Sequence, residues 1–415
     1  MRVKILAGLA VLLALIAAGG VYGWVQLSQP IPPIVAATSF PTSLTVEGEP
    51  PALPWPSQGA AAVAVPEIGI VGTSGPKTPR PIASIAKVMT AYLVLTDHPL
   101  APREPGPTVG VTAEDVRIFE ADLADGQSVV PVVAGEQLTE YQLLQALLLP
   151  SGNNIADLLA KWDAGSREAF VAKMNAKAGE MGMSSTRFAD ASGYSPQTVS
   201  TATDLIILGQ AAMREPVFAE IVAQQEAAIP VAERIFNVNT DLGRGGNIGI
   251  KTGSTPEAGA CFMFAARRTV NDREMVLVGA VLDQPQLSDA FARSSDIAAA
   301  AARGVRMSRV LDTSTVVGTY AAPWGPKVDA MPAENVDFLA WPGMAVSVEA
   351  QLDPIEAPLQ SGDRVGLLSL KLGDQSKTVE LVASGSIPSP GRTWRLLRPL
   401  RELGVVSSTA GAANR

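Results

Sequence analysis

Apolar and polar positions divide the chain into regions of different periodicity. The first region is an uncharged, mostly apolar run over residues 5–25, which follows the basic residues Arg2 and Lys4. As a helix, a run of this length spans the roughly 30 Å hydrocarbon core of a bilayer. The sequence therefore predicts that 1–25 is either an uncleaved signal anchor or a signal peptide, with the remainder of the chain outside the cytoplasmic membrane.

Residues 26–59 are rich in proline and carry no helical or strand periodicity. Proline lacks the backbone N–H that helices and central strands use, and proline-rich segments are semi-rigid and extended. We therefore expect 26–59 to be a linker that separates the membrane segment from the next domain.

Strand-like and helical patterns are interleaved over 60–307. Runs of β character are expected at 60–65, 68–71, 248–252, 261–267 and 275–282, with a turn at 73–76. Helical spacing begins near Ser84, dominates 112–182 and returns at 203–213 and 296–303. This pattern predicts an α+β domain in which an antiparallel sheet is flanked by helices and an all-helical lobe is inserted.

Beyond residue 307 the pattern changes to short alternating segments separated by Gly-Asp turns, which is typical of a small all-β domain over 312–390. The last segment, 391–415, is basic and amphipathic, with an arginine at every third position from Arg392 to Arg401. A solvated tail is favoured over a membrane contact because Pro399 interrupts any helix there.

Charge and composition exclude several classes of function. The formal net charge of −8 and the lack of a long basic cluster argue against a nucleic-acid partner. The chain has one cysteine, Cys261, and one histidine, His98, so a zinc site built from such ligands is not expected. We predict neither a metal nor another cofactor.

Ser84 and Lys87 are the first candidates for chemistry. At i and i+3 on one helix, the hydroxyl and the amine lie on the same face. The following residues are apolar, and burial lowers the pKa of an amine toward the range of a general base. A second match, Ser74 to Lys77, lies in a Gly-Pro turn and is interpreted as chance. The alternative for the first is a serine near a helix start with a solvent-exposed lysine.

Two other stretches carry suitable side chains. Ser151 and Asn153 lie in a break between two predicted helices, where they could relay a proton and hold a substrate amide, or merely cap a helix. The run Lys251, Thr252, Gly253 and Ser254 follows an apolar strand. Its cation and hydroxyl suit a carboxylate, and its glycine allows close approach of a ligand, although an exposed strand end would look similar.

With these motifs the chain resembles the serine-type D-alanyl-D-alanine carboxypeptidases, which are low-molecular-mass penicillin-binding proteins. The resemblance covers roughly 60–304 and includes residues 83–91, 200–205 and 249–253, with a weaker similarity at 361–366. It implies that peptidoglycan stem peptides are the substrates and that β-lactams acylate the enzyme.

The resemblance also implies residue roles. Ser84 would attack the terminal D-Ala-D-Ala bond, Lys87 would take its proton, and Ser151 and Asn153 would pass the proton to the leaving amine and hold the substrate. Lys251 and Thr252 would bind the free carboxylate, while the backbone N–H groups of Ser84 and Ser254 would form an oxyanion hole.

Other functions of the same fold stay open. A class A β-lactamase would need a Glu-x-x-Leu-Asn element, which is absent between Asn153 and Asp204. A peptidoglycan endopeptidase or transpeptidase would share all the motifs, because the acyl-enzyme can react with water or an amine. A catalytically silent wall-binding protein, acting through the β domain, is the alternative from another class.

Overall fold

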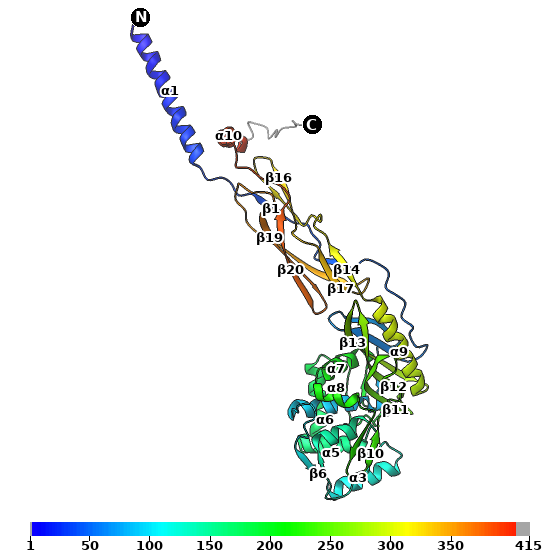
Figure 1. Cartoon of the computed structure of the whole chain (residues 1–415). Coiled ribbons are helices and arrows are strands. Elements are labelled where there is room, and N and C mark those ends of the chain that lie inside the picture. Colours follow the sequence, from blue (N-terminus) through cyan, green and yellow to red (C-terminus); the bar gives the residue numbers. More distant parts are fainter. Residues whose placement is uncertain (1, 404–415) are drawn as a thin grey trace. The chain divides into compact units, whose positions relative to one another are not determined.

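The computed structural model describes residues 2–403, which form two compact units (Figure 1). Among the described residues, unit 1 contains 2–47, 308–338 and 343–403, and unit 2 contains 48–307 and 339–342. The candidate residues identified from the sequence all belong to unit 2.

A five-stranded antiparallel sheet is the framework of unit 2. Its strands, in spatial order, are β11 (Asn247–Thr255), β12 (Gly259–Val270), β13 (Arg273–Gln284), β3 (Ala60–Val65) and β4 (Gly69–Ser74). The turn that we expected at Thr73 and Ser74 is wrong at these two positions, because both residues pair with β3 as part of β4. The predicted meander of the three longer strands is confirmed.

Helices cover both faces of this sheet (Figure 1). Neighbouring residues of a strand point to opposite faces. On β12, Phe262 contacts Phe291 of α9 (Leu287–Gly304), whereas Met263 lies next to Gly209 of α7 (Ala202–Ala212). The continuous apolar run 260–266 of β12 thus follows from burial on both sides.

The remaining helices form the predicted all-helical lobe around α2 (Lys87–Asp97), whose residues are almost all buried. It contains α3 (Ala113–Ala124), α4 (Glu140–Leu148), α5 (Asn153–Ala164), α6 (Arg167–Glu180) and α8 (Pro216–Val222). Short strand pairs connect these parts: β5 (Arg80–Pro81) with β8 (Val199–Ser200), β6 (Thr108–Gly110) with β7 (Gln137–Thr139), and β9 (Glu226–Ile229) with β10 (Glu233–Phe236).

Unit 1 contains a seven-stranded antiparallel sheet. Its order is β1 (Val35–Ala37), β15 (Gly318–Ala321), β16 (Lys327–Pro332), β20 (Gln375–Ala383), β19 (Arg364–Leu372), β18 (Ala345–Leu352) and β2 (Ser43–Thr45). The strands β14 (Arg306–Leu311) and β17 (Val336–Ala340) pair separately. The predicted α+β class with a C-terminal β domain is confirmed.

The expectation that 26–59 is only a linker is wrong, because β1 and β2 come from it and form the two edges of the unit 1 sheet. Prolines flank these strands without interrupting them. Because edge strands use only one side of their backbone for pairing, they tolerate proline-rich surroundings better than central strands do.

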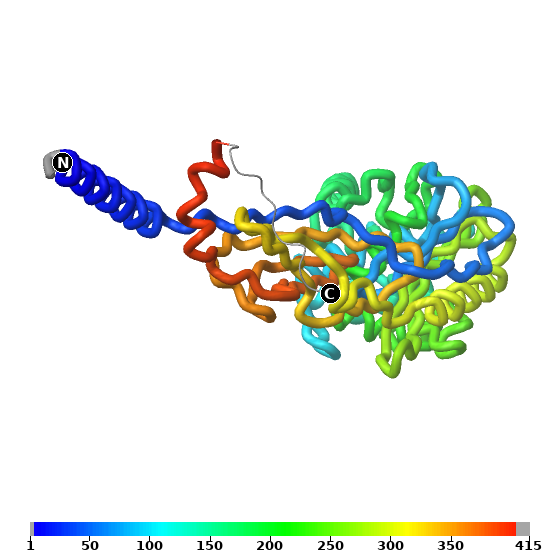
Figure 2. Tube along the Cα trace, turned by 90° about the horizontal axis from the view of Figure 1, so that it is seen from above, coloured from blue at the N-terminus to red at the C-terminus, as the bar shows by residue number. Residues whose placement is uncertain are grey.

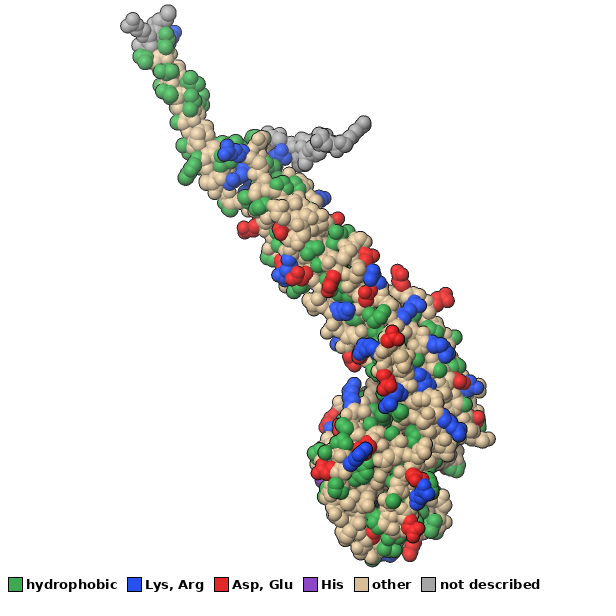
Figure 3. Space-filling model, in the orientation of Figure 1, with side chains coloured by type: hydrophobic (Ala, Val, Ile, Leu, Met, Phe, Trp, Pro, Cys, Tyr) green, Lys and Arg blue, Asp and Glu red, His purple; other side chains and the backbone are tan. Residues whose placement is uncertain are grey.

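Helix α1 (Arg2–Ser28) belongs to unit 1 and is long and apolar enough to cross a membrane; the side chains of residues 4–22 are exposed (Figure 3). Its composition suits a membrane anchor and a signal sequence equally. The helix α10 (Arg392–Glu402) lies next to the end of α1, as the tube in Figure 2 shows. Tyr22 of α1 donates a hydrogen bond to the Leu396 carbonyl of α10 (2.9 Å).

The helix α10 contradicts our expectation that Pro399 prevents a helix. Its Arg395 and Arg398 instead donate hydrogen bonds to the backbone carbonyls of Gln29 and Pro30, at the start of the proline-rich segment. The remainder of the predicted basic tail, 404–415, lies outside the described residues.

Candidate active site

Ser84 and Lys87 lie at a change of helix type. Ser84 is in the 3₁₀ turn η1 (Ala83–Ala86), and Lys87 is the first residue of α2. A 3₁₀ turn has three residues per turn, so side chains at i and i+3 eclipse each other more closely than in an α-helix. The Lys87 Nζ lies 2.9 Å from the Ser84 Oγ. The alternative of a solvent-exposed Lys87 is wrong, because the residue is 0 % exposed.

Lys87 Nζ has two further partners, the side-chain Oδ1 of Asn153 at 2.6 Å and the backbone carbonyl of Ser192 at 2.9 Å. Burial lowers the pKa of Lys87 well below its usual value, and the neighbouring Lys251 lowers it further, against a weaker opposing effect from Asp190. The amine is therefore poised to lose its proton.

Asn153 is the first residue of α5, and Gly152 is the N-cap, with no side-chain capping bond. The interpretation of Ser151 and Asn153 as helix caps is therefore wrong. The Asn153 amide nitrogen donates to the Gln127 Oε1 at 2.6 Å, which orients the carboxamide oxygen toward Lys87. The Ser151 Oγ is buried and has no hydrogen-bond partner among the described residues. A buried hydroxyl of this kind is available to a ligand.

The strand β11, which contains residues 251–254, runs next to Ser84. A Cβ on Gly253 would lie 2.9 Å from the Ser84 backbone nitrogen, so a side chain here would force the strand away. Lys251 is 2 % exposed, its Nζ donates a hydrogen bond to the Thr252 carbonyl (3.2 Å), and burial lowers its pKa to about 7. Thr252 is also buried, whereas Ser254 is exposed.

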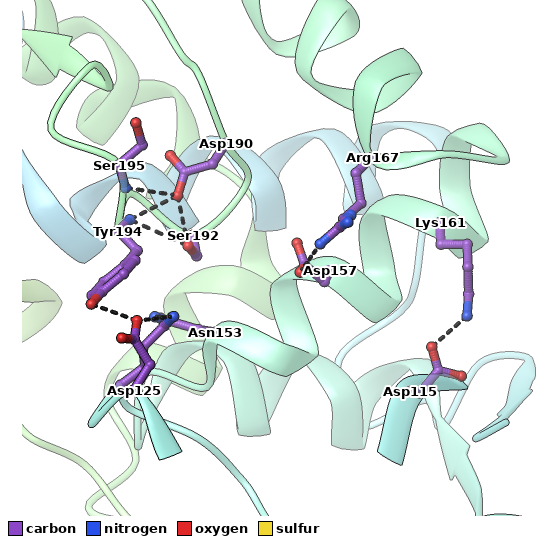
Figure 4. Close-up of polar contacts among 11 residues, drawn as sticks. Asp115, Asp125, Asn153, Asp157, Lys161, Arg167, Asp190, Ser192, Tyr194 and Ser195 are labelled. Carbon is purple, nitrogen blue, oxygen red and sulfur yellow. Dashed lines mark hydrogen bonds and ion pairs between the residues drawn. The ribbon is translucent and has the colours of Figure 1, made fainter. Parts of the chain in front are cut away.

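The sequence reasoning missed the loop 189–195, whose Ser192 carbonyl contacts Lys87. Asp190 fixes this loop: its Oδ2 accepts hydrogen bonds from the Ser192 Oγ (2.8 Å) and from the backbone nitrogens of Tyr194 (2.8 Å) and Ser195 (3.2 Å), as Figure 4 shows. Since the contact with Lys87 is made by a backbone carbonyl, no side-chain pattern could have indicated it.

The structure thus brings Ser84, Lys87, Asn153, and the strand carrying Lys251 and Gly253 to one place. His98 lies elsewhere, stacked on Trp162 with ring centroids 4.1 Å apart. A buried amine bonded to a hydroxyl is the arrangement that nucleophilic acyl transfer by a serine requires.

A family model described as D-alanyl-D-alanine carboxypeptidase, of the peptidase S11 type, matches residues 68–286. The chain belongs to this family. The resemblance seen in the motifs is confirmed, and the protein is a serine hydrolase of the D-alanyl-D-alanine carboxypeptidase family.

Two proteins that are similar in sequence to this chain agree with the family assignment. The D-alanyl-D-alanine carboxypeptidase DacB2 of Mycobacterium tuberculosis is 42% identical over 158 residues, which cover 36% of this chain and 54% of the relative. A D-alanyl-D-alanine endopeptidase of Pseudomonas aeruginosa is 32% identical over 275 residues, covering 64% of this chain and 81% of the relative.

Solved structures show the same fold. The DD-transpeptidase of Streptomyces K15 matches with a TM-score of 0.53 and 25% identity over 63% of this chain and 98% of that chain. Penicillin binding protein 5 from Haemophilus influenzae matches with a TM-score of 0.59 over 81% of this chain and 99% of that chain, and at 19% identity it speaks for the fold alone.

Proposed function

We propose that this protein removes the terminal D-alanine from peptidoglycan stem pentapeptides through an acyl-enzyme on Ser84. The observation that carries the proposal is the buried Lys87 amine, held 2.9 Å from the Ser84 hydroxyl. Ser84 Oγ would bond to the carbonyl carbon of the terminal peptide bond, D-alanine would leave with a proton, and water would then hydrolyse the ester.

The partners of Lys87 suit a neutral amine. Such an amine has two N–H groups and one lone pair. The Asn153 Oδ1 and the Ser192 carbonyl can only accept hydrogen bonds, so they take the two N–H groups. The lone pair is then left for the Ser84 hydroxyl, from which it removes the proton as the bond to the substrate forms.

We assign the remaining roles by position. The protonated form of Lys251, with the Thr252 hydroxyl, would hold the substrate carboxylate. Ser151, whose hydroxyl lacks a partner among the described residues, would pass the proton to the leaving amine. The backbone N–H groups of Ser84 and Ser254 would stabilise the oxyanion, and Gly253 lets β11 approach closely enough for this. In cells, α1 would hold the enzyme at the outer face of the cytoplasmic membrane.

The nucleophile and the base are tested by covalent labelling with a fluorescent penicillin. The wild-type protein should be labelled, and Ser84→Ala should not. Lys87→Ala should lose acylation by at least about 100-fold, since general base catalysis typically contributes this much. Label that persists on Ser84→Ala would show that another residue is the nucleophile.

The substrate is tested with a synthetic pentapeptide that ends in D-Ala-D-Ala, by measuring released D-alanine. Failure to release D-alanine would refute the carboxypeptidase assignment. The similarity to an endopeptidase of Pseudomonas aeruginosa supports one second candidate, the hydrolysis of peptide cross-links. A cross-linked peptide dimer assayed in parallel distinguishes the two activities.

A further inference from the structure

A chain of hydrogen bonds leads from the proposed base to the surface of unit 2. The Asn153 carboxamide accepts a bond from the Lys87 Nζ (2.6 Å) and donates one to the Gln127 Oε1 (2.6 Å). The Gln127 amide nitrogen in turn donates to the Asp125 Oδ2 (3.1 Å). Lys87 and Asn153 are buried, Gln127 is half-buried and Asp125 is exposed, so the chain connects the buried amine with solvent.

The two amides could make these contacts in either orientation. A carboxamide has an acceptor oxygen and a donor nitrogen on one planar group, and a rotation by 180° exchanges them without changing its shape. If Asn153 and Gln127 were both turned, they would still bond to each other, but the Asn153 nitrogen would face Lys87. Its N–H group would then donate to the lone pair of the neutral amine, which would no longer be available to the Ser84 hydroxyl.

Asp125 removes this ambiguity. An ionised carboxylate can only accept hydrogen bonds, so the Gln127 nitrogen must face it. The Gln127 oxygen then faces Asn153, and the Asn153 oxygen faces Lys87. The Tyr194 hydroxyl donates a second bond to the same Oδ2 at 2.8 Å (Figure 4). The bonds from Tyr194 and Gln127 lower the pKa of Asp125, which keeps the group ionised.

The local structure holds these groups in place, and helix stability does not explain the carboxylate. Asp125 is the C-cap of α3, where a negative charge is unfavourable beside the helix dipole. Gly126 follows with a φ of +73°, and the segment after it is tied to the start of α5, because the Asn153 backbone N–H donates to the Ser128 carbonyl (2.7 Å). This turn places Gln127 between Asp125 and Asn153.

We propose that Asp125 is a positioning residue: it sets the direction of the hydrogen-bond chain and thereby keeps the lone pair of Lys87 free for Ser84. Asp125 acts through Gln127 and Asn153. This inference rests on the proposed function, whose general base it explains. A donor at position 125 should reverse the chain and slow acylation, whereas an obligate acceptor at position 127 should restore the direction.

The test measures the rate of acylation by a fluorescent penicillin in the full-length protein. Asp125→Lys replaces the acceptor by a donor, which would face the Gln127 oxygen and turn both amides. Because one charge-assisted hydrogen bond then favours the wrong orientation, acylation should slow at least about tenfold. Asp125→Glu keeps an acceptor and should acylate at close to the wild-type rate.

Adding Gln127→Glu to Asp125→Lys gives the most informative comparison. The new carboxylate at position 127 has nearly the size of glutamine, pairs with the new amine at position 125 and can only accept from Asn153, so the rate should recover. A contact of Asp125 with Tyr194 cannot explain such a recovery, because the double variant does not restore it. Glu120→Lys is the matched control for charge at an exposed position of α3 and should keep the wild-type rate.

Three results would overturn the proposal: an unchanged rate in Asp125→Lys, an equally slow Glu120→Lys, or a double variant as slow as Asp125→Lys. Thermal unfolding checks that each variant is folded, which is expected because position 125 is exposed. These three results leave the proposed function intact. A wild-type protein that is not labelled at all would refute the acyl-enzyme itself, and this inference with it.

Discussion

Gly193 lies where the loop 189–195 packs against η1, the turn that carries the proposed nucleophile Ser84. Its φ is +80°, and a Cβ at this position would lie 1.8 Å from the Ala83 carbonyl oxygen and 2.9 Å from the Ala86 Cβ. In Gly193→Ala the loop must therefore move by about 1.6 Å to reach an ordinary contact of 3.4 Å. The Ser192 carbonyl, the preceding backbone group, moves with it.

The size of the expected effect follows from this movement. The bond between Lys87 Nζ and the Ser192 carbonyl, now 2.9 Å, would be broken, leaving a buried N–H group without an acceptor. Such a loss costs about 1–3 kcal/mol, so acylation should slow by roughly five- to 150-fold. The left-handed φ separately lowers the free energy of unfolding by about 1–2 kcal/mol.

Gly165→Ala is the matched control, because Gly165 has the same φ of +80° and nothing within 4 Å of the added Cβ. Both variants should lose stability in thermal unfolding because of the left-handed φ, and Gly193→Ala should lose more because of its clash with Ala83. Only Gly193→Ala should acylate slowly with a fluorescent penicillin. Equal acylation rates for the two folded variants would refute the role that we give to the loop.

Two further predictions concern the buried amines. Below pH 7, Lys251→Met should raise the melting temperature by at least about 2 °C. The reason is that the folded wild-type protein buries an ammonium group, whose pKa is lowered to about 7, and methionine removes this charge. This gain in melting temperature should shrink as the pH rises from about 7 toward 10.5, where the lysine of the unfolded chain also loses its proton. A gain that stays constant with pH would contradict the buried ammonium. For Lys87, whose pKa burial lowers well below 10.5, the acylation rate should fall on acidification with a midpoint far below that value; stopped-flow measurements that place the midpoint near 10.5 would contradict a buried base.

The sequence was most informative where chemistry depends on side chains. Ser84 and Lys87 were recognised from their spacing, and the apolar residues after Lys87 correctly indicated burial and a lowered pKa. In the five-stranded sheet of unit 2, β3, β12 and β13 were visible because each contains a continuous apolar run. Local pattern and tertiary structure agree in these segments.

Features that depend on distant partners could not be predicted. Ser192 contacts Lys87 through its backbone carbonyl, a group that every residue carries. The strands β1 and β2 are three residues long each, too short for periodicity to appear, and their existence depends on β15 and β18 far along the chain. The helix α10 continues through Pro399 while its arginines bind carbonyls of the proline-rich segment.

The origin of β1 and β2 has a consequence for biosynthesis. Val35 pairs with Ala321, and Ser43 pairs with Ser347, so these segments must wait for partners that are synthesised much later. The seven-stranded sheet therefore cannot be completed until β20 has been synthesised, and such non-local pairing is slow. A chain stopped before β15 would keep both early segments unpaired, which would make them targets for proteases that remove incomplete products.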